Sequence, residues 1–142
     1  MLVRLLYASR AAAPLTPAVI DSIMEQSKWH NVPRGITGLL CYSDDQFIQV
    51  LEGGRDAVCE LYNTIVTDPR HVHVRILYFE EIAERRFGGW TMGQVNLSKI
   101  NPALLLKYSE RPELDPFSCS GSASLALLDE LIATGSVVGR GG

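Results

Sequence analysis

The sequence lacks the features of a membrane-spanning, metal-binding or strongly basic protein. No apolar run reaches the ~18 residues of a membrane span, and no His, Cys, Asp or Glu cluster has the spacing of zinc ligands. Lys and Arg number 13 against 16 Asp and Glu, giving a net charge of −3, which argues against non-specific nucleic-acid binding. An odd number of cysteines is typical of reduced thiols. They are Cys41, Cys59 and Cys119.

These absences favour a cytoplasmic protein with no bound metal, no direct nucleic-acid partner and no membrane partner. The chain enters a strand-like run at Leu2, so we expect no signal peptide. Its 142 residues are the usual length of one domain. Hydrophobic residues make up 46% and charged residues 20%, close to the globular average, which excludes a mainly disordered chain.

The hydrophobic pattern predicts alternating strands and helices. Thr16 and Pro17 suit the start of the first helix, and the short polar segment 43–45 suits a hairpin. We expect strands at 2–8, 36–42, 46–52 and 72–80, helices at 17–29 and 55–67, and a short fifth strand at 91–96. The order β-α-β-β-α-β predicts an α+β, ferredoxin-like fold with an added fifth strand.

The last third of the chain is predicted to cover the second face of this sheet. Phe47, Ile48, Val50 and Leu51 are apolar on both sides of one strand, so both faces need cover. A short helical piece near 104–108 and a helix through 125–132 can provide it. We therefore interpret residues 98–135 as a C-terminal helical cap of the same domain, and 136–142 as a flexible tail.

Gln49 and Tyr7 are the first polar groups that need an explanation. Gln49 lies mid-strand between apolar residues, and it either faces water at a sheet edge or contacts a ligand, since a buried unpaired amide is costly. Tyr7 is either a core residue with its hydroxyl at the rim or a partner of Gln49 across the sheet. Ser9, just past the strand, is typical of a turn.

Other polar and aromatic groups allow two readings. His30 and Asn31 can simply end the first helix. Asp68, Arg70 and His71 form a solvated turn, or they hold a polar ring edge or a phosphate. Trp90 and Met92, two residues apart, are predicted to share one face of the fifth strand. They serve as hydrophobic cover, or Met92 packs near a planar ring.

Taken together, these segments strongly resemble the blue-light-sensing flavin domains known as BLUF. The matching segments are 6–9 (LYAS), 30–31 (HN), 35–42 (GITGLLCY), 47–53 (FIQVLEG), 68–71 (DPRH) and 86–92 (RFGGWTM). The resemblance covers residues 1–97, which we interpret as the flavin-binding domain. It implies non-covalent FAD between the two helices, against the sheet.

The resemblance also implies roles for individual residues. Tyr7 would donate an electron and a proton to the excited flavin, and Gln49 would lie between the Tyr7 hydroxyl and the flavin N5/O4 edge. Asn31 would bond the pyrimidine edge and His30 would pack against the ring. Further implied neighbours are Asp68, Arg70 and His71 at the outer flavin edge, and Ser9, Trp90 and Met92 as gating neighbours of Gln49. Thr64 departs from members with a basic residue there.

The resulting expectation is a blue-light photoreceptor rather than an enzyme. It would signal through contacts with an unidentified downstream protein, as a homo-oligomer, with the signal leaving through the Trp90–Met92 segment toward the C-terminal helices. Two alternatives stay open. One is a flavin-dependent enzyme or small hydrolase on the same fold, which needs an open cleft or a nucleophile–base pair. The other is a binding module in which flavin is structural or absent.

Overall fold

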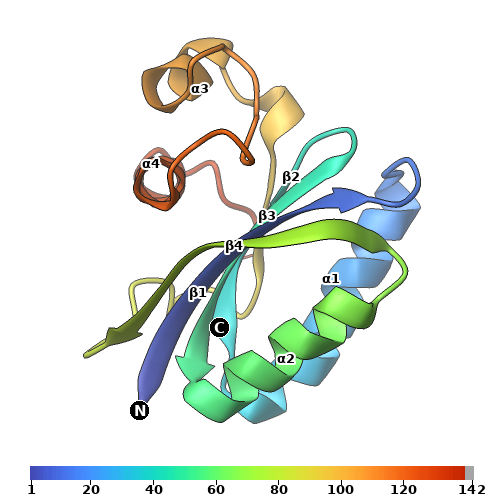
Figure 1. Ribbon diagram of the computed structural model, residues 1–142, viewed down its shortest axis with the longest axis vertical. Helices are drawn as coiled ribbons and strands as arrows, with labels where there is room; N and C mark the ends of the chain where they lie inside the picture. The colour runs from blue at the N-terminus through green and yellow to red at the C-terminus, as the bar shows by residue number, and fades with distance from the viewer. Residues whose placement is uncertain (140–142) are drawn as a thin grey trace.

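A computed structural model describes residues 1–139 and contains one five-stranded sheet (Figure 1). The strands are β1 (Leu2–Ala11), β2 (Thr37–Tyr42), β3 (Gln46–Gly54), β4 (His71–Ile82) and β5 (Gly93–Asn96), in the order β4-β1-β3-β2-β5. All neighbours are antiparallel except β2 and β5, which are parallel. The predicted α+β, ferredoxin-like fold with an added fifth strand is confirmed.

Helices cover both faces of the sheet. Figure 1 shows α1 (Pro17–Asn31) and α2 (Arg55–Thr67) side by side under one face, with α3 (Pro102–Tyr108) and α4 (Gly121–Ala133) beyond the other. Short 3-10 turns at Val32–Arg34 and Leu97–Lys99 complete the described elements. The expected C-terminal cover therefore lies where the two-sided apolar strands require it.

Strand alternation divides the buried side chains into two cores. Odd-numbered β1 residues such as Leu5 and Tyr7 pack toward α1 and α2, whereas Leu6 and Ala8 pack toward the C-terminal helices. β3 repeats the pattern, with Leu51 on the first side and Ile48 on the second. The first core is thus the place where the two predicted flavin-flanking helices meet the sheet.

The helices α1 and α2 begin where the sequence pattern predicts, although α1 ends two residues later; β1, β3 and β4 extend beyond their predicted ranges, whereas β2 and β5 begin later than predicted. The Thr16 hydroxyl caps α1 by accepting from the N–H of Val19 at 3.3 Å, and Pro17 is its first residue. The helix α2 spans the predicted residues 55–67. β1 runs to Ala11 rather than residue 8, since its ladder with β3 continues to the pair Arg10–Gln46.

The predicted shared face of Trp90 and Met92 is wrong. Both residues precede β5, which begins at Gly93. Met92 is fully buried in the α1/α2 core, whereas Trp90 packs against the C-terminal core. The cause is a turn: the N–H of Trp90 donates to the carbonyl of Phe87 at 3.2 Å, and the Trp90 carbonyl accepts from Gly38 at 3.0 Å. Two-residue alternation applies only to extended strands.

The tail that we expected to be flexible from residue 136 is tied to the sheet at Val138. The backbone N–H and carbonyl of Val138 pair with those of Gln94 at 3.0 and 2.8 Å. The remainder of that predicted segment, residues 140–142, lies outside the described residues. Among residues 1–139, no helix has both the length and the apolar character needed to cross a membrane.

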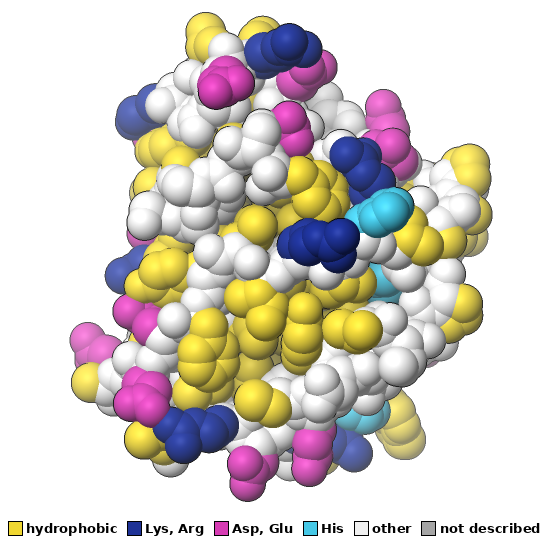
Figure 2. Space-filling model, in the orientation of Figure 1, with side chains coloured by type: hydrophobic (Ala, Val, Ile, Leu, Met, Phe, Trp, Pro, Cys, Tyr) yellow, Lys and Arg dark blue, Asp and Glu magenta, His cyan; other side chains and the backbone are white. Residues whose placement is uncertain are grey.

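Exposed apolar side chains gather along the edge strand β4 and the neighbouring helix α2. In Figure 2, hydrophobic groups form a patch over this part of the molecule. The exposed large hydrophobic residues of the two elements are Val66, Val72, Ile76 and Phe79. Contiguous apolar surface of this kind is typical of a contact site.

Candidate functional site

A cavity of about 320 Å³ opens between α1 and α2, with the sheet as its floor. Its wall is mainly apolar, with polar groups converging on it from several elements, which is the usual character of a cofactor site. The floor comes from Tyr7, Leu40 and Gln49. The sides are lined by Ile23, Gln26, Ser27, Trp29, His30 and Asn31 from α1, by Leu61, Thr64 and Ile65 from α2, and by Asp68, Arg70 and His71.

Tyr7 and Gln49 form the central polar contact of the floor. They are register partners in the β1–β3 ladder, and both are buried. The Tyr7 hydroxyl donates to Oε1 of Gln49. Burial, reinforced by the charge of Asp68, raises the pKa of Tyr7, so the phenol keeps its proton and acts as the donor.

The other end of the Gln49 amide reaches the loop before β5. Its Nε2 donates to Sδ of Met92 at 3.4 Å, and Met92 is fully buried. Since the Tyr7 hydroxyl donates to Oε1 of Gln49, Nε2 is left for the weak acceptor sulfur. Gln49 therefore connects the cavity floor with the segment that leads to β5.

Two polar pairs close the cavity at the turn before β4. Arg70 binds both carboxylate oxygens of Asp68, with the shortest contact at 2.7 Å, and this hydrogen bonding lowers the pKa of Asp68. Nδ1 of His71 lies 2.9 Å from Oγ of Ser9, and its ring packs on Phe47 at 4.8 Å between centroids. Burial lowers the pKa of His71, which favours the neutral ring.

Asn31 is the residue of the cavity wall that best fits a hydrogen bond to a bound flavin. It is 1% exposed, and its side-chain oxygen Oδ1 is buried without a hydrogen-bond partner. A buried amide oxygen without a donor is costly. The pyrimidine edge of a flavin has an N–H between two carbonyls, so it can supply that donor. His30 and Thr64 lie at the exposed rim of the same cavity.

The structure brings together all seven side chains that the sequence predicted as cofactor contacts. Ser9 and Met92 do not line the cavity themselves. Ser9 contacts His71, and Met92 contacts Gln49, and both of these partners line the cavity. Trp90 is absent from the lining and packs in the opposite core. Sequence reasoning missed the apolar walls, chiefly Ile23, Leu40, Leu61 and Ile65. Their helical or strand spacing is visible in the sequence, but the same spacing is typical of ordinary core residues.

Comparisons with known proteins agree with this geometry. The sequence profile of a family described as "BLUF: Sensors of blue-light using FAD" matches residues 2–93. The photoactivated adenylate cyclase subunit beta of Euglena longa is 37% identical over 92 residues, which are 64% of this chain and 11% of that protein. This chain therefore spans only a small part of the length of that relative.

Two solved structures extend the likeness to the C-terminal helices. The dark-state structure of BlrB, a BLUF protein, superposes with a TM-score of 0.78 at 35% identity, covering 94% of this chain and 96% of that one. Klebsiella pneumoniae BlrP1, solved with FMN and cyclic diGMP, gives a TM-score of 0.69 at 32% identity, over 95% of this chain and 35% of that one. The fold is thus similar to nearly the whole of one BLUF protein and to about a third of a longer protein.

Proposed function

The chain belongs to the BLUF family of blue-light sensors, and we propose that the Tyr7–Gln49 pair is the switch through which it senses light. The observation that carries this proposal is the hydrogen bond between the two side chains at the floor of the cavity. Gln49 contacts Tyr7 at one end of its amide and Met92 at the other. Reversing that amide would therefore change the contacts on both sides at once.

Flavin is the cofactor class of this family, and we propose FAD as the flavin of this chain. Asn31 and Gln49 would bond the polar edge of the ring, and the Asp68–Arg70 pair would stand at its outer edge. Trp29, 86% exposed, continues the cavity wall onto the surface of α1. An exposed indole offers a stacking face for the adenine that FAD carries and FMN lacks. Trp29→Ala should therefore weaken FAD binding more than FMN binding.

Tyr7 and Gln49 supply the proposed proton movement. Bound flavin supplies absorption of blue light and an electron acceptor in its excited state. With flavin bound, Tyr7 would give an electron to the excited ring and its phenolic proton to Oε1 of Gln49. The Gln49 amide would then rotate or tautomerise while the electron returns from the ring and the proton returns to Tyr7. Gln49 would be left as a hydrogen-bond donor to the ring, and this stronger hydrogen bond would shift the absorption to longer wavelength.

No covalent bond to a cysteine is needed for this switch. Cys41 is fully buried, and burial raises the pKa of its thiol to about 12. Such a thiol is a poor nucleophile and packs as a small hydrophobic residue. The chain is accordingly a light-sensing module, and the flavin-dependent enzyme is the less favoured alternative.

We propose that the output is a protein contact made in the cytoplasm. The relatives named above include an adenylate cyclase subunit and a protein solved with cyclic diGMP, and we propose a protein of signalling-nucleotide metabolism as the downstream partner of this chain. The apolar patch on β4 and α2 is the surface that we propose for contact with a second copy.

The direct test is an absorption spectrum of the purified, FAD-loaded protein in darkness and under blue light. We expect a flavin spectrum that shifts to longer wavelength and recovers in darkness. A bound flavin whose spectrum does not change with light would overturn the proposed switch. A preparation that fails to bind added FAD would overturn the cofactor assignment as well.

A further inference from the structure

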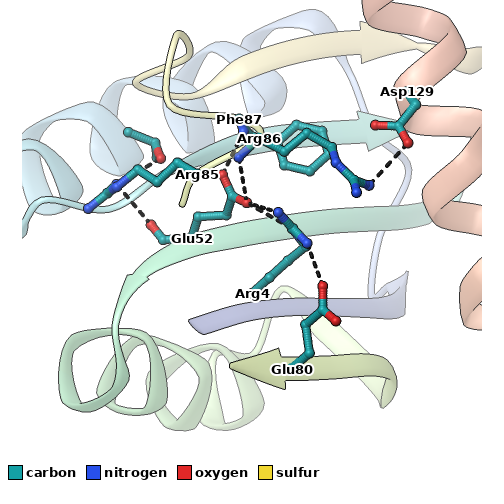
Figure 3. A network of polar contacts seen from close by, with 8 residues as sticks. Arg4, Glu52, Glu80, Arg85, Arg86, Phe87 and Asp129 are labelled. Atoms are coloured by element: carbon teal, nitrogen blue, oxygen red, sulfur yellow. Dashed lines mark hydrogen bonds and ion pairs between the residues drawn. The ribbon is translucent and has the colours of Figure 1, made fainter. Parts of the chain in front are cut away.

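A buried ion-pair network lies on the sheet face opposite the cavity (Figure 3). Arg4 and Glu52 are register partners on β1 and β3, and they are 4% and 0% exposed. Arg4 binds Oε2 of Glu52 through Nε at 2.8 Å and Nη2 at 2.7 Å, and Glu80 through Nη1 at 2.6 Å. Charges are rarely placed this deep in a core unless they are paired.

Glu52 also holds the backbone of the loop between β4 and β5. Its Oε1 accepts from the N–H of Phe87 at 2.6 Å, and its Oε2 accepts from the N–H of Arg86 at 3.1 Å. Figure 3 shows these two bonds converging on the carboxylate beside Arg4. Hydrogen bonds to a buried carboxylate are among the strongest in proteins. This end of the loop is therefore firmly attached to β3.

The same loop ends at Met92, the residue that contacts Gln49. Gln49 and Glu52 are three residues apart on β3 and face opposite sides of the sheet. β3 thus holds the loop at two points, strongly through Glu52 and weakly through the 3.4 Å contact of Gln49 with sulfur. Trp90, between these two points, packs against the core formed with α4.

We propose that Glu52 is a positioning residue that anchors the loop in darkness and in light, so that a reversal of Gln49 moves only residues 88–92. This inference rests on the proposed function. Because the anchor does not yield, displacement of Met92 is passed to Trp90 and from there to the core of α4. The side chain of Arg86 donates to Asp129 of α4 at 3.1 Å and so links that helix to the anchored end of the loop.

The test is amide hydrogen exchange of the FAD-loaded protein in darkness and under light, in wild type, Glu52→Gln and Glu80→Gln. In wild type, the amides of Arg86 and Phe87 should be equally protected in both states, while those of residues 90–93 exchange faster in light. Glu52→Gln should lose about tenfold or more protection at Arg86 and Phe87, keep the red shift, and lose most of the light-dependent exchange of α4.

Glu80→Gln is the matched control, because Glu80 binds the same Arg4 but makes no bond to the loop backbone in the described structure. Glu80→Gln should keep the wild-type protection of the Arg86 and Phe87 amides, the red shift, and the light-dependent exchange of α4. Glu52→Gln leaves the buried guanidinium of Arg4 without its Glu52 partner. If that variant does not fold, the double variant Arg4→Met/Glu52→Gln removes this charge as well and serves the same test.

The two ways of failing are distinguishable. A wild-type protein without a red shift overturns the proposed function, and this inference with it. A normal red shift combined with unchanged α4 exchange in the Glu52 variant overturns the inference alone. Loss of protection at Phe87 on illumination of the wild type also overturns it.

Discussion

Tyr7 and Gln49 face each other across the β1–β3 ladder, and the Tyr7 hydroxyl donates to the Gln49 side-chain carbonyl inside the core. The register explains this contact, because residues directly opposite in an antiparallel pair point to the same face. Both side chains are buried, with exposed fractions of 1% for Tyr7 and 5% for Gln49. A change in the hydrogen bonding of either side chain therefore alters the hydrogen bonding of the other.

Gln49→Leu should abolish the light-induced red shift while flavin stays bound. Leucine fills a similar volume but has no amide to reverse or to bond Tyr7. Absorption difference spectra of the FAD-loaded variant provide the measurement. Gln46→Leu, on the same strand but outside the cavity lining, is the control and should keep the shift. A normal photocycle in Gln49→Leu would defeat the assignment.

Met92→Ala should keep the spectral shift and weaken the output. The substitution removes the sulfur that accepts from Gln49 Nε2 and leaves a cavity that costs about 2–5 kcal/mol of stability. Met92→Leu separates these effects, since it conserves volume and costs less than about 1.5 kcal/mol. Light-dependent partner binding or hydrogen exchange of α4 reports the output. An output as large as that of wild type in both variants would remove Met92 from the signal route.

Asn31→Ala should weaken flavin binding about tenfold or more, because the buried amide oxygen would no longer meet the ring N–H. Calorimetric titration of the apoprotein with FAD measures the effect. Asn63→Ala, at an exposed position of α2 that is absent from the cavity lining, is the matched control. Equal affinities for the two variants would show that Asn31 does not contact the flavin.

His71 should make the stability of the folded protein depend on pH near neutrality. Burial lowers the pKa of His71 below its usual 6.5, so the unfolded chain binds more protons than the folded one as the pH falls through 6.5. Stability is therefore lost toward acid. The measurement is the melting temperature at pH 7.5 and at pH 5.5, about one pH unit on either side of the ordinary histidine pKa. Between these two pH values, the melting temperature of wild type should fall more than that of His71→Gln. An equal fall of the melting temperature in wild type and in His71→Gln would contradict the effect of burial on the pKa of His71.

The sequence allowed the fold and the main polar groups of the cavity to be predicted, because the strands and helices that hold them follow local periodicity. The helix 55–67 follows from the spacing of Val58, Leu61, Tyr62 and Ile65, and its bounds agree with the structure. The odd-numbered positions of β1 and β3 place Tyr7 and Gln49 on one face whenever the two strands pair in register. These relationships follow from the geometry of helices and strands.

The loop before β5 could not be predicted in this way. Its shape depends on a carboxylate 35 residues away, since Phe87 N–H donates to Glu52, and no local pattern reports such a contact. Trp90 and Met92 therefore point to different cores rather than to one face. The sequence does contain one signal, namely the charged residues Arg4 and Glu52 among the mainly apolar residues of β1 and β3.

The most direct test of the central claim is a light-minus-dark infrared difference spectrum of the FAD-loaded protein. We expect the stretching band of the flavin C4 carbonyl to move to lower frequency under blue light, because the switched Gln49 amide would donate to that carbonyl, and we expect Gln49→Leu to lack this change. A red shift in visible absorption without movement of the C4 carbonyl band would contradict the role assigned to Gln49.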